Sequence, residues 1–481
     1  MVMDILSYGI GSLAAFALLI WVAFLFVRDI TQKKHGVLRN FPVIGRLRYF
    51  FEQLGEYFRQ YFFSGDREEM PFNRATRGWV YRLAKNEGGT IGFGSTYDLH
   101  APGALIFVNH PFPVLEEERL PTPSLVLGEG HCRNPFEARS IVNISGMSYG
   151  AISAPAVRSL SRGASVAGCW LDTGEGGLAP YHLEGGCDVI MQIGTAKFGL
   201  RDAQGELSPE RLIEVSKGVK AFEIKLSQGA KPGKGAILPG TKVTPEIAQI
   251  RGIPQGRDAI SPNRHRDISS MNELVERIAS IRDLTGRPVG VKTAIGGWRF
   301  MNELADTVHR RGLEFAPDFL VIDGGEGGSG AAPQALADHM ALSIDEALPR
   351  VVDSLIESGL RQRVRVIAAG KIVTSARAAW ALAAGADFIN TARGFMFSLG
   401  CIQALRCHQN TCPTGVTTHN KRLQRALVVE EKYLRVANYC NGMNREIDMI
   451  AHSCGVRHAR ELRREHVRIV QANHQSIALN M

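Results

Sequence analysis

The chain has 481 residues, of which 45% are hydrophobic and 21% are charged. This composition allows a large buried core, and it excludes both a mostly disordered chain and a membrane protein with many spans. The formal net charge is +9, and residues 28–86 alone hold 12 Lys and Arg against 6 Asp and Glu. Because this basic region directly follows the first apolar segment, it is typical of a membrane flank, and we expect no nucleic-acid partner.

The first predicted element is an uncharged segment of 23 residues, 5–27. As a helix it is long enough to cross the hydrocarbon layer of a bilayer, which is about 30 Å thick. Asp4 precedes it and basic residues from Arg28 onward follow it, which is the reverse of the order in a cleaved signal peptide. We therefore expect residues 1–34 to be a single-pass anchor in the inner (cytoplasmic) membrane, with the catalytic domain in the cytoplasm. A buried helix of a soluble protein is the alternative.

Residues 35–100 form an N-terminal amphipathic and aromatic segment. Within it, residues 47–63 read LRYFFEQLGEYFRQYFF, in which aromatic side chains are dense and charges are scattered. Over this whole stretch the apolar face is not cleanly one-sided. Two alternatives therefore stay open, a helix in the plane of the membrane interface and a helix packed on the folded domain.

Residues 101–435 have the pattern of a barrel. Short apolar runs, most of them ending in glycine, alternate there with helical stretches such as 269–284 and 343–358. Strands alternating with helices predict parallel βαβ units of an α/β fold, and seven or more of them fit a (β/α)8 TIM barrel better than an open sheet. Residues 436–481 are expected to form a C-terminal helical tail. The predicted strands are 141–144, 189–193, 222–226, 289–293, 319–323, 364–368 and 388–390.

Conspicuous motifs follow the predicted strands, at the end where barrel enzymes place their chemistry. The insertion 229–268 carries five prolines and predicts an ordered loop over this face. Gly370 and Lys371 end one late strand unit, and Arg393 and Gly394 end the next. Glycine-backed N–H groups and positive charge after the last two strands favour a phosphate-bearing cofactor.

The segment 323–330 reads DGGEGGSG, with five glycines in eight residues. This pattern predicts the close approach of a flat ligand or of another backbone, with Gly328, Ser329 and Gly330 as candidates, and a flexible loop is the alternative. Lys292 ends an apolar strand, where a lone charge should be paired or functional. It either supplies positive charge to the N1/O2 edge of a reduced flavin or pairs with Asp323.

Cys401, Cys407 and Cys412 have the spacing C-x5-C-x4-C, followed by Pro413. Three thiols so close together on a cytoplasmic chain are poor candidates for disulfides, and soft thiolates favour an iron–sulfur cluster or zinc. Zinc needs a fourth ligand, and His408 is too close to Cys407 in the chain for both to bind one tetrahedral ion. The spacing favours an iron–sulfur cluster, with zinc and unrelated buried thiols as alternatives.

Eight stretches, taken in chain order, resemble a known family. They are SGMSYGAIS, TGEGG, QIGTAKFG, IKLSQGAKPGKGAILPGTKV, ISPNRHRDI, VKT, GGSGAAP and LGCIQALRCHQNTCPTGV. Over residues 140–420 the chain resembles the FMN-binding synthase domain of glutamate synthase, and the QGAKPGKG and cysteine motifs are the specific ones. The resemblance implies a barrel that holds FMN and a 3Fe-4S cluster and reduces 2-iminoglutarate, formed from 2-oxoglutarate and ammonia, to L-glutamate.

The resemblance also implies roles for single residues. The three cysteines would ligate the cluster, and Lys292 and Glu175 are the candidate catalytic residues. Gln228 and Lys231 would bind the substrate, where a lysine matches the charge of a dicarboxylate. Together with the positions named above, the candidates for cofactor binding are Met147, Ser148, Gln192, Lys292, Gly328, Ser329, Gly330, Gly370, Lys371, Arg393 and Gly394.

The chain departs from the family pattern at two places. Gly325 and Glu326 stand where the family has His-Asp, and 293–297 replace a stretch that carries an acidic residue. Alternative substrates are therefore another 2-oxo acid, an imine or an N-substituted glutamate, and a membrane-docked electron-transfer subunit is a further alternative. Electrons would come from a separate donor, a ferredoxin or a reductase, and nitrogen from free ammonia or a separate amidotransferase.

Overall fold

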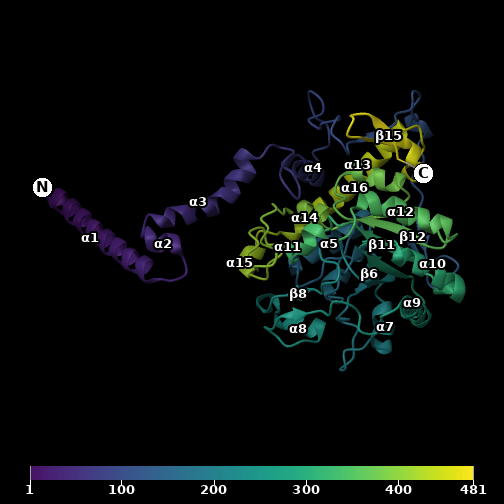
Figure 1. The fold of residues 1–481 in the computed structure, drawn as a ribbon, viewed down its shortest axis with the longest axis horizontal. Helices are drawn as coiled ribbons and strands as arrows, with labels where there is room; N and C mark the ends of the chain where they lie inside the picture. Colours follow the sequence, from purple (N-terminus) through teal and green to yellow (C-terminus); the bar gives the residue numbers. More distant parts are fainter. Residues whose placement is uncertain (1, 480–481) are drawn as a thin grey trace. The chain divides into compact units, whose positions relative to one another are not determined.

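The computed structural model describes residues 2–479, with two compact units divided between Ala75 and Thr76. The first unit is helical (Figure 1). Among the described residues, one helical segment, Gly9–Thr31, is long and apolar enough to cross a membrane, as judged by length and composition. The predicted apolar helix is therefore present, whereas its insertion in a membrane is a proposal. The elements of this unit are α1 (Val2–Thr31), α2 (Gly36–Asn40), α3 (Gly45–Phe58) and the π-helical turn η1 (Arg59–Phe63).

The second unit contains a closed barrel of eight parallel strands, which confirms the predicted fold. Seven strands match the predicted runs to within one residue at each end. The eighth, β5, has only two residues, too few to give an apolar run in the sequence. The strands are β4 (Val142–Ile144), β5 (Leu171–Asp172), β6 (Val189–Ile193), β7 (Ala221–Lys225), β10 (Val289–Thr293), β11 (Phe319–Asp323), β12 (Arg365–Ala369) and β13 (Phe388–Thr391).

Amphipathic helices connect these strands. In α12, the buried side chains Ile344, Ala347, Leu348, Val351 and Leu355 recur at helical spacing and form one apolar face. The helices are α5 (Ala154–Ala167), α6 (Pro180–Leu183), α7 (Pro209–Ser216), α9 (Met271–Thr285), α10 (Arg299–Arg311), α11 (Gln334–His339), α12 (Ile344–Glu357), α13 (Ser375–Ala383) and α14 (Arg393–Leu399).

A hairpin closes the amino-terminal end of the barrel. Its strands, β2 (Leu125–Leu127) and β3 (Phe136–Ala138), pair antiparallel and place Leu127 and Phe136 in the central apolar cluster. There they join Trp170 and Phe388, which lie at or before the first residue of a barrel strand. Since this end is filled by apolar side chains, the opposite, carboxyl end is left for polar chemistry.

The insertion 229–268 forms a small structure of its own, with the hairpin β8 (Ile237–Leu238) and β9 (Ala259–Ile260) and helix α8 (Pro245–Arg251). The region predicted as a helical tail holds most of α16 (Val429–Ser453) and then β14 (Val467–Val470) and β15 (Ser476–Ala478). These two strands form a sheet with β1 (Leu105–Phe107). Helices α4 (Arg74–Ala84) and α15 (Lys421–Gln424) complete the α-helices of the described chain.

Gly290 gives a test of the barrel packing. It pairs in register with Phe319, and a Cβ added to it would lie 2.2 to 2.5 Å from atoms of that buried ring. We expect Gly290→Ala to lower the free energy of unfolding by about 1–3 kcal/mol because the ring has no room to move. The measurement is the thermal or urea midpoint, with Gly297→Ala as the control, since no atom lies within 4 Å of a Cβ there. Equal midpoints for the two variants would contradict this packing.

Candidate active site

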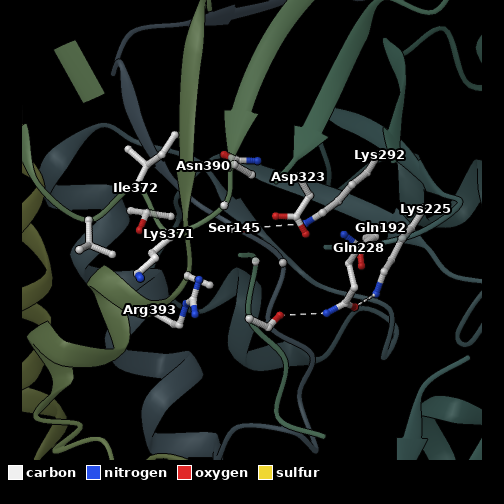
Figure 2. A pocket seen from close by; sticks show the side chains of 18 residues that line it. Ser145, Gln192, Lys225, Gln228, Lys292, Asp323, Lys371, Ile372, Asn390 and Arg393 are labelled. Carbon is white, nitrogen blue, oxygen red and sulfur yellow. Dashed lines mark hydrogen bonds between the residues drawn. The ribbon is translucent and has the colours of Figure 1, made fainter. Parts of the chain in front are cut away.

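A pocket of about 500 Å³ opens at the carboxyl ends of the barrel strands (Figure 2). Residues from seven of the eight strand ends reach it, because parallel strands all point their carboxyl ends to the same side of a barrel. Its lining is polar and rich in glycine. The residues are Ser145, Gly146, Gln192, Lys225, Gln228, Lys292, Asp323, Gly327, Gly328, Ala369, Gly370, Lys371, Ile372, Val373, Asn390, Thr391, Ala392 and Arg393.

Lys292 is the central cation of the pocket. It is 5% exposed, and its Nζ donates to Ser145 Oγ at 3.4 Å. Burial alone would lower its pKa, but the carboxyl groups of Asp323, Glu223 and Asp172 outweigh burial and raise the pKa of Lys292 above its ordinary value. The ammonium group is therefore kept charged at the base of the pocket, where Figure 2 shows it pointing toward Asp323.

Two carboxyl groups and an amide lie together beneath Lys292. Gln192 Nε2 donates to Glu223 Oε1 at 2.7 Å and to Asp172 Oδ2 at 3.4 Å. Burial, followed by the charge of Glu223, raises the pKa of Asp172, and burial likewise raises the pKa of Glu223. Burial thus favours the neutral form of both carboxyl groups, while the charge of Lys292 favours their ionised form.

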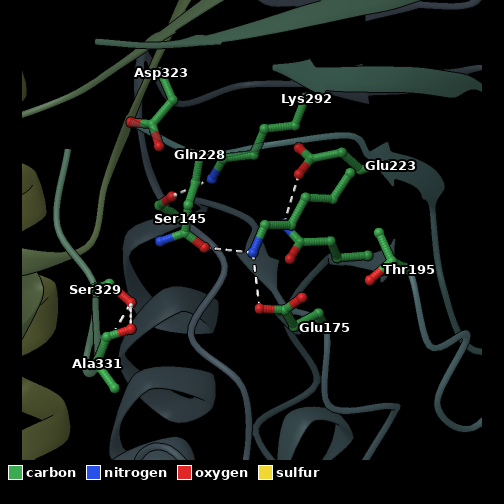
Figure 3. A network of polar contacts seen from close by, with 12 residues as sticks. Ser145, Glu175, Thr195, Glu223, Gln228, Lys292, Asp323, Ser329 and Ala331 are labelled. Carbon is green, nitrogen blue, oxygen red and sulfur yellow. Dashed lines mark hydrogen bonds and ion pairs between the residues drawn. The ribbon is translucent and has the colours of Figure 1, made fainter. Parts of the chain in front are cut away.

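A second polar group lies at the other side of the pocket (Figure 3). Lys225 Nζ donates to Glu175 Oε1 at 2.8 Å and to Gln228 Oε1 at 2.5 Å. Although burial opposes it, Lys225 and Lys231 together lower the pKa of Glu175, which keeps this carboxylate ionised. Gln228 Nε2 in turn donates to Gly328 O at 3.0 Å, which ties this group to the glycine-rich loop.

The loop after β12 has the backbone of an anion-binding turn. Gly370 has a φ of 110° and Lys371 a φ of 56°, and the left-handed conformation is uncommon for a lysine. Arg393 NH2 donates to Glu326 O at 2.6 Å and lies beside the loop of Gly328. Two cations from neighbouring strand ends thus line one side of the pocket together with glycine backbone, which suits a phosphate group.

Seven of the predicted site residues line this pocket. They are Gln192, Gln228, Lys292, Gly328, Gly370, Lys371 and Arg393. Glu175 lies next to the pocket and accepts a hydrogen bond from Lys225. Lys231 is 5% exposed and lies near enough to Glu175 and Lys225 for their charges to act on it. Burial lowers the pKa of Lys231 to about 8.

The remaining predicted positions do not line the pocket. Met147 and Ser148 follow Gly146 and pack against the backbone of Gly174. Ser329 Oγ donates to Ala331 O within its own loop. At Gly394, an added Cβ would lie 2.1 Å from the hydroxyl of Tyr439, so this glycine is required by the packing of α16 against α14.

The Glu326 side chain points away from the pocket. Both of its carboxylate oxygens accept from Ile344 N, at 3.2 and 3.1 Å, at the start of α12. A carboxylate is favoured there by the positive end of the helix. Gly325, the other residue that departs from the family pattern, adds no side chain. Gly325 and Glu326 therefore place no polar side chain toward the pocket, at the two positions where the family pattern has His and Asp.

The three cysteines lie in the loop that follows α14. Burial raises the pKa of the Cys401 thiol to about 12 and also raises that of Cys407. Burial acts on Cys412 as well, but hydrogen bonds from Thr414 and Thr417 outweigh it and lower the pKa of that thiol. Each of the other two thiols influences the pKa of Cys401, so the three are near enough to interact electrostatically.

Cations and donors surround this cysteine loop. Lys242, from the insertion, is 2% exposed and donates from Nζ to Cys407 O and to Ala151 O, both at 2.9 Å. Tyr81 donates to Cys401 O at 2.6 Å. Among residues 2–479, no group of three or more His, Cys, Asp or Glu side chains is arranged as a metal site. The donor chemistry fits an iron–sulfur cluster, and the cluster itself is a proposal.

The glycine-rich loop connects the pocket to the cysteines. Gly327 and Gly328 line the pocket, and a Cβ added to Gly330 would lie 3.9 Å from the Cβ of Cys407. Along the chain, only Ser329 separates Gly328, which lines the pocket, from Gly330, which lies beside Cys407.

Sequence reasoning missed several charged residues in the pocket lining and beneath it. Asp172, Glu223 and Lys225 are buried in strands and face the barrel interior. A signal was available, because charged residues inside apolar strands are rare unless they are paired or functional. Ser145 and Asn390 gave no such signal, since small polar residues at strand ends are common.

Comparison with known proteins finds relatives whose names contain glutamate synthase. The protein named "Glutamate synthase large subunit-like protein YerD" of Bacillus subtilis is 40% identical over 486 residues, covering 92% of each chain. "Archaeal glutamate synthase (NADPH)" of Methanocaldococcus jannaschii is 36% identical over 341 residues, 70% of this chain and 63% of the archaeal one. The chain thus spans less than two thirds of that archaeal enzyme.

Among solved structures, a mutant of an active chimera of (S)-mandelate dehydrogenase aligns with a TM-score of 0.50 at 12% identity, over 81% of this chain and 98% of that one. At this identity the likeness shows the fold alone. A family model described as the conserved region in glutamate synthase matches residues 113–457, which contain the whole barrel, the pocket and the cysteine loop. On this match, and on its 40% identity to the Bacillus relative, the chain belongs to the glutamate synthase family.

Proposed function

We propose that the chain is a membrane-anchored, glutamate synthase-like oxidoreductase that reduces 2-iminoglutarate, formed from 2-oxoglutarate and ammonia, to L-glutamate. The observation that carries this proposal is the pocket itself. It has cations at two separate places, Lys371 with Arg393 on one side and Lys225 with Lys292 on the other. One place suits the phosphate of a cofactor and the other the carboxylates of a small substrate.

FMN is the cofactor that fits this pocket and the family. We assign its phosphate to the turn of Gly370 and Lys371 and to Arg393, and its ring system to the space beside Gly327 and Gly328. Glycine is needed along this loop because a flat ring approaches the backbone closely. When bound, FMN supplies the hydride chemistry that the protein side chains lack.

The side chains of the chain itself bind and orient the substrate. Lys292 holds a fixed positive charge at the base of the pocket, and Gln192 holds the two carboxyl groups beneath it. Lys225 and Lys231 provide positive charge for the substrate carboxylates, while Gln228 positions Lys225. Glu175 keeps Lys225 in place through the 2.8 Å ion pair. Met147, Ser148, Ser329, Gly330 and Gly394 are proposed to support the flavin site from the surrounding loops.

We assign Cys401, Cys407 and Cys412 to a 3Fe-4S cluster, supported by the polar donors around them and by the approach of Gly330 to Cys407. A separate ferredoxin or reductase would deliver electrons, and free ammonia or a separate amidotransferase would deliver nitrogen. Helix α1 would anchor the chain in the inner membrane, with the barrel in the cytoplasm.

One observation favours a second candidate substrate. At the two positions where the family pattern has His-Asp, Gly325 has no side chain and Glu326 caps α12. The pocket therefore has fewer polar groups at this edge than the resemblance implies. A related 2-oxo acid, imine or N-substituted glutamate is the alternative to 2-iminoglutarate, and an electron-transfer subunit without a substrate is the alternative to an enzyme.

The proposed reaction is tested with chemically reduced full-length chain, 2-oxoglutarate and ammonium. We expect reoxidation of the flavin together with formation of L-glutamate, measured by chromatography. Flavin reoxidation by a different 2-oxo acid alone would shift the assignment to the second candidate. Reoxidation that no small 2-oxo acid affects would contradict an enzymatic role.

Lys371 tests the assignment of the phosphate site. We expect Lys371→Met to weaken FMN binding by at least about tenfold, because a buried phosphate loses one of its two cations. The measurement is fluorescence titration of the deflavinated chain with FMN and with riboflavin, which has no phosphate. Lys217→Met, at an exposed surface position, is the control. A variant that weakens FMN and riboflavin equally would contradict a phosphate contact.

The lowered pKa of Lys231, to about 8, predicts a pH dependence of substrate binding. Below this pH the ammonium is charged and attracts a dicarboxylate, and above it the amine is neutral. We therefore expect KM for 2-oxoglutarate to rise as the pH increases through about 8. Lys231→Arg should remove this rise, because arginine stays charged over the whole range. A rise that persists unchanged in the arginine variant would contradict the assignment.

The cysteine assignment predicts that Cys407→Ser and Cys412→Ser lose iron and the broad visible absorption of a cluster. Cys187→Ser is the matched control, because this thiol lies near Ser161 and away from the cysteine loop. Iron content and the electron paramagnetic resonance spectrum of protein purified without oxygen are the measurements. Zinc in place of iron in the unmodified chain would contradict the cluster.

A further inference from the structure

Helix α3 carries large apolar side chains that the structure leaves exposed. Phe50 is 53% exposed, Phe51 63% and Leu47 54%. The π-helical turn η1 that follows continues the pattern, with Phe62 74% and Phe63 75% exposed. Soluble proteins rarely expose so many neighbouring aromatic side chains, and such a surface marks an interaction site.

Most of the large apolar side chains of α3 form one face. At 3.6 residues per turn, Leu47, Phe50, Phe51, Leu54 and Phe58 fall within an arc of about 100°. Arg48, Glu52 and Glu56 fall on the opposite side of the helix, while Arg46, at one edge of the face, pairs with Asp29. The face is thus one-sided over α3, although the whole stretch 47–63 did not indicate this, because Tyr49 lies off the face and residues 59–63 leave the α-helical geometry.

An ion pair fixes α3 to the end of α1. Asp29, on the last turns of α1, is 1% exposed, and its Oδ2 accepts from Arg46 Nε at 2.9 Å and from Val43 N at 3.0 Å. Arg46 is the second residue of α3. A buried carboxylate with three donors, counting the second nitrogen of Arg46, holds its partners strongly. The start of α3 is therefore held beside the end of the apolar helix, and both helices belong to the same compact unit.

The connection between the two helices is basic. Arg28, Lys33, Lys34 and Arg39 lie between the apolar part of α1 and the start of α3, and Arg48 follows. In this stretch Asp29 is the one acidic residue, and its charge is matched by Arg46. The net positive charge, next to an apolar helix end and an exposed apolar face, complements an anionic lipid surface.

We propose that α3 and η1 form an in-plane membrane helix, which lies in the headgroup region with its aromatic face toward the acyl chains and binds anionic phospholipid. The proposal rests on the proposed insertion of α1 in the same membrane. It goes beyond an anchor, because it gives the chain a second, lipid-selective attachment. An aromatic face with basic flanks is the pattern of interfacial helices, and two attachments hold a protein on a membrane more firmly than one.

The test uses the full chain with a protease site inserted between Gln32 and Gly36, reconstituted in phosphatidylcholine vesicles with or without phosphatidylglycerol. Flotation on the neutral vesicles before cleavage shows whether α1 is inserted, because α3 is not expected to hold the chain on them. After cleavage, we expect the part that starts at α2 to stay on the vesicles that contain phosphatidylglycerol and to leave the neutral ones. With Phe50→Ser, Phe51→Ser and Phe58→Ser together, retention should fall by roughly tenfold.

The matched control is Gln53→Ser, on the polar side of α3, and it should retain the cleaved chain as the unmodified protein does. The aromatic variant keeps Asp29 and Arg46, so equal retention by variant and unmodified chain would show that the ion pair alone holds the fragment and would overturn the proposal. Complete release of the unmodified fragment from every vesicle would overturn it too, in favour of a protein partner for this face.

A second measurement covers the case in which the aromatic variant does not fold. Hydrogen exchange of residues 45–63 in the uncleaved, unmodified chain should slow when phosphatidylglycerol is added to phosphatidylcholine nanodiscs. Exchange that is independent of lipid charge would overturn the proposal. Loss of glutamate formation with intact flotation would count against the proposed reaction and leave this inference unaffected, so the two failures are distinguishable.

Discussion

The candidate site depends on the burial of one ammonium group, Lys292, among carboxyl groups inside a barrel. Water is largely excluded there, and an unpaired charge would cost several kcal/mol by typical values. Asp323, Glu223 and Asp172 offset this cost, and Gln192 bridges two of them by hydrogen bonds. The result is a fixed positive charge at the base of the pocket. A negatively charged cofactor or substrate meets this charge without any rearrangement of the protein, which is the condition for electrostatic preorganisation.

The rest of the fold keeps the charged groups around Lys292 at the carboxyl end of the barrel. The β2–β3 hairpin fills the amino end of the barrel with apolar side chains, so the charged groups lie at the opposite end. The insertion 229–268 contacts the charged end of the barrel at two places. Gly229 N donates to Asp323 Oδ2 at 2.9 Å, and Lys242 Nζ donates to Cys407 O in the cysteine loop. One segment thereby contacts both the pocket and the thiols. A change in the insertion is for this reason expected to affect both places.

The sequence allowed much of the fold to be predicted, because seven strands are apolar runs with glycine or polar residues at their ends. Strand β5 was missed since two residues carry no periodicity. Lys371 and Arg393 line one pocket because each directly follows a strand, and parallel strands bring such residues together; their contact with a cofactor stays a prediction. The direction of Glu326 was not predictable, as it depends on the start of α12 18 residues later. The same holds for the Asp29–Arg46 pair, whose members are 17 residues apart and on different helices.

A crystal structure of the full chain, purified without oxygen and with its cofactors bound, is the most direct measurement. We predict FMN at the carboxyl end of the barrel, with its phosphate between Lys371 and Arg393 and the edge of its ring system near Lys292. The ring should face the glycine-rich loop on the side toward Cys407. A flavin bound elsewhere, or a pocket occupied by protein side chains from the insertion, would contradict this assignment.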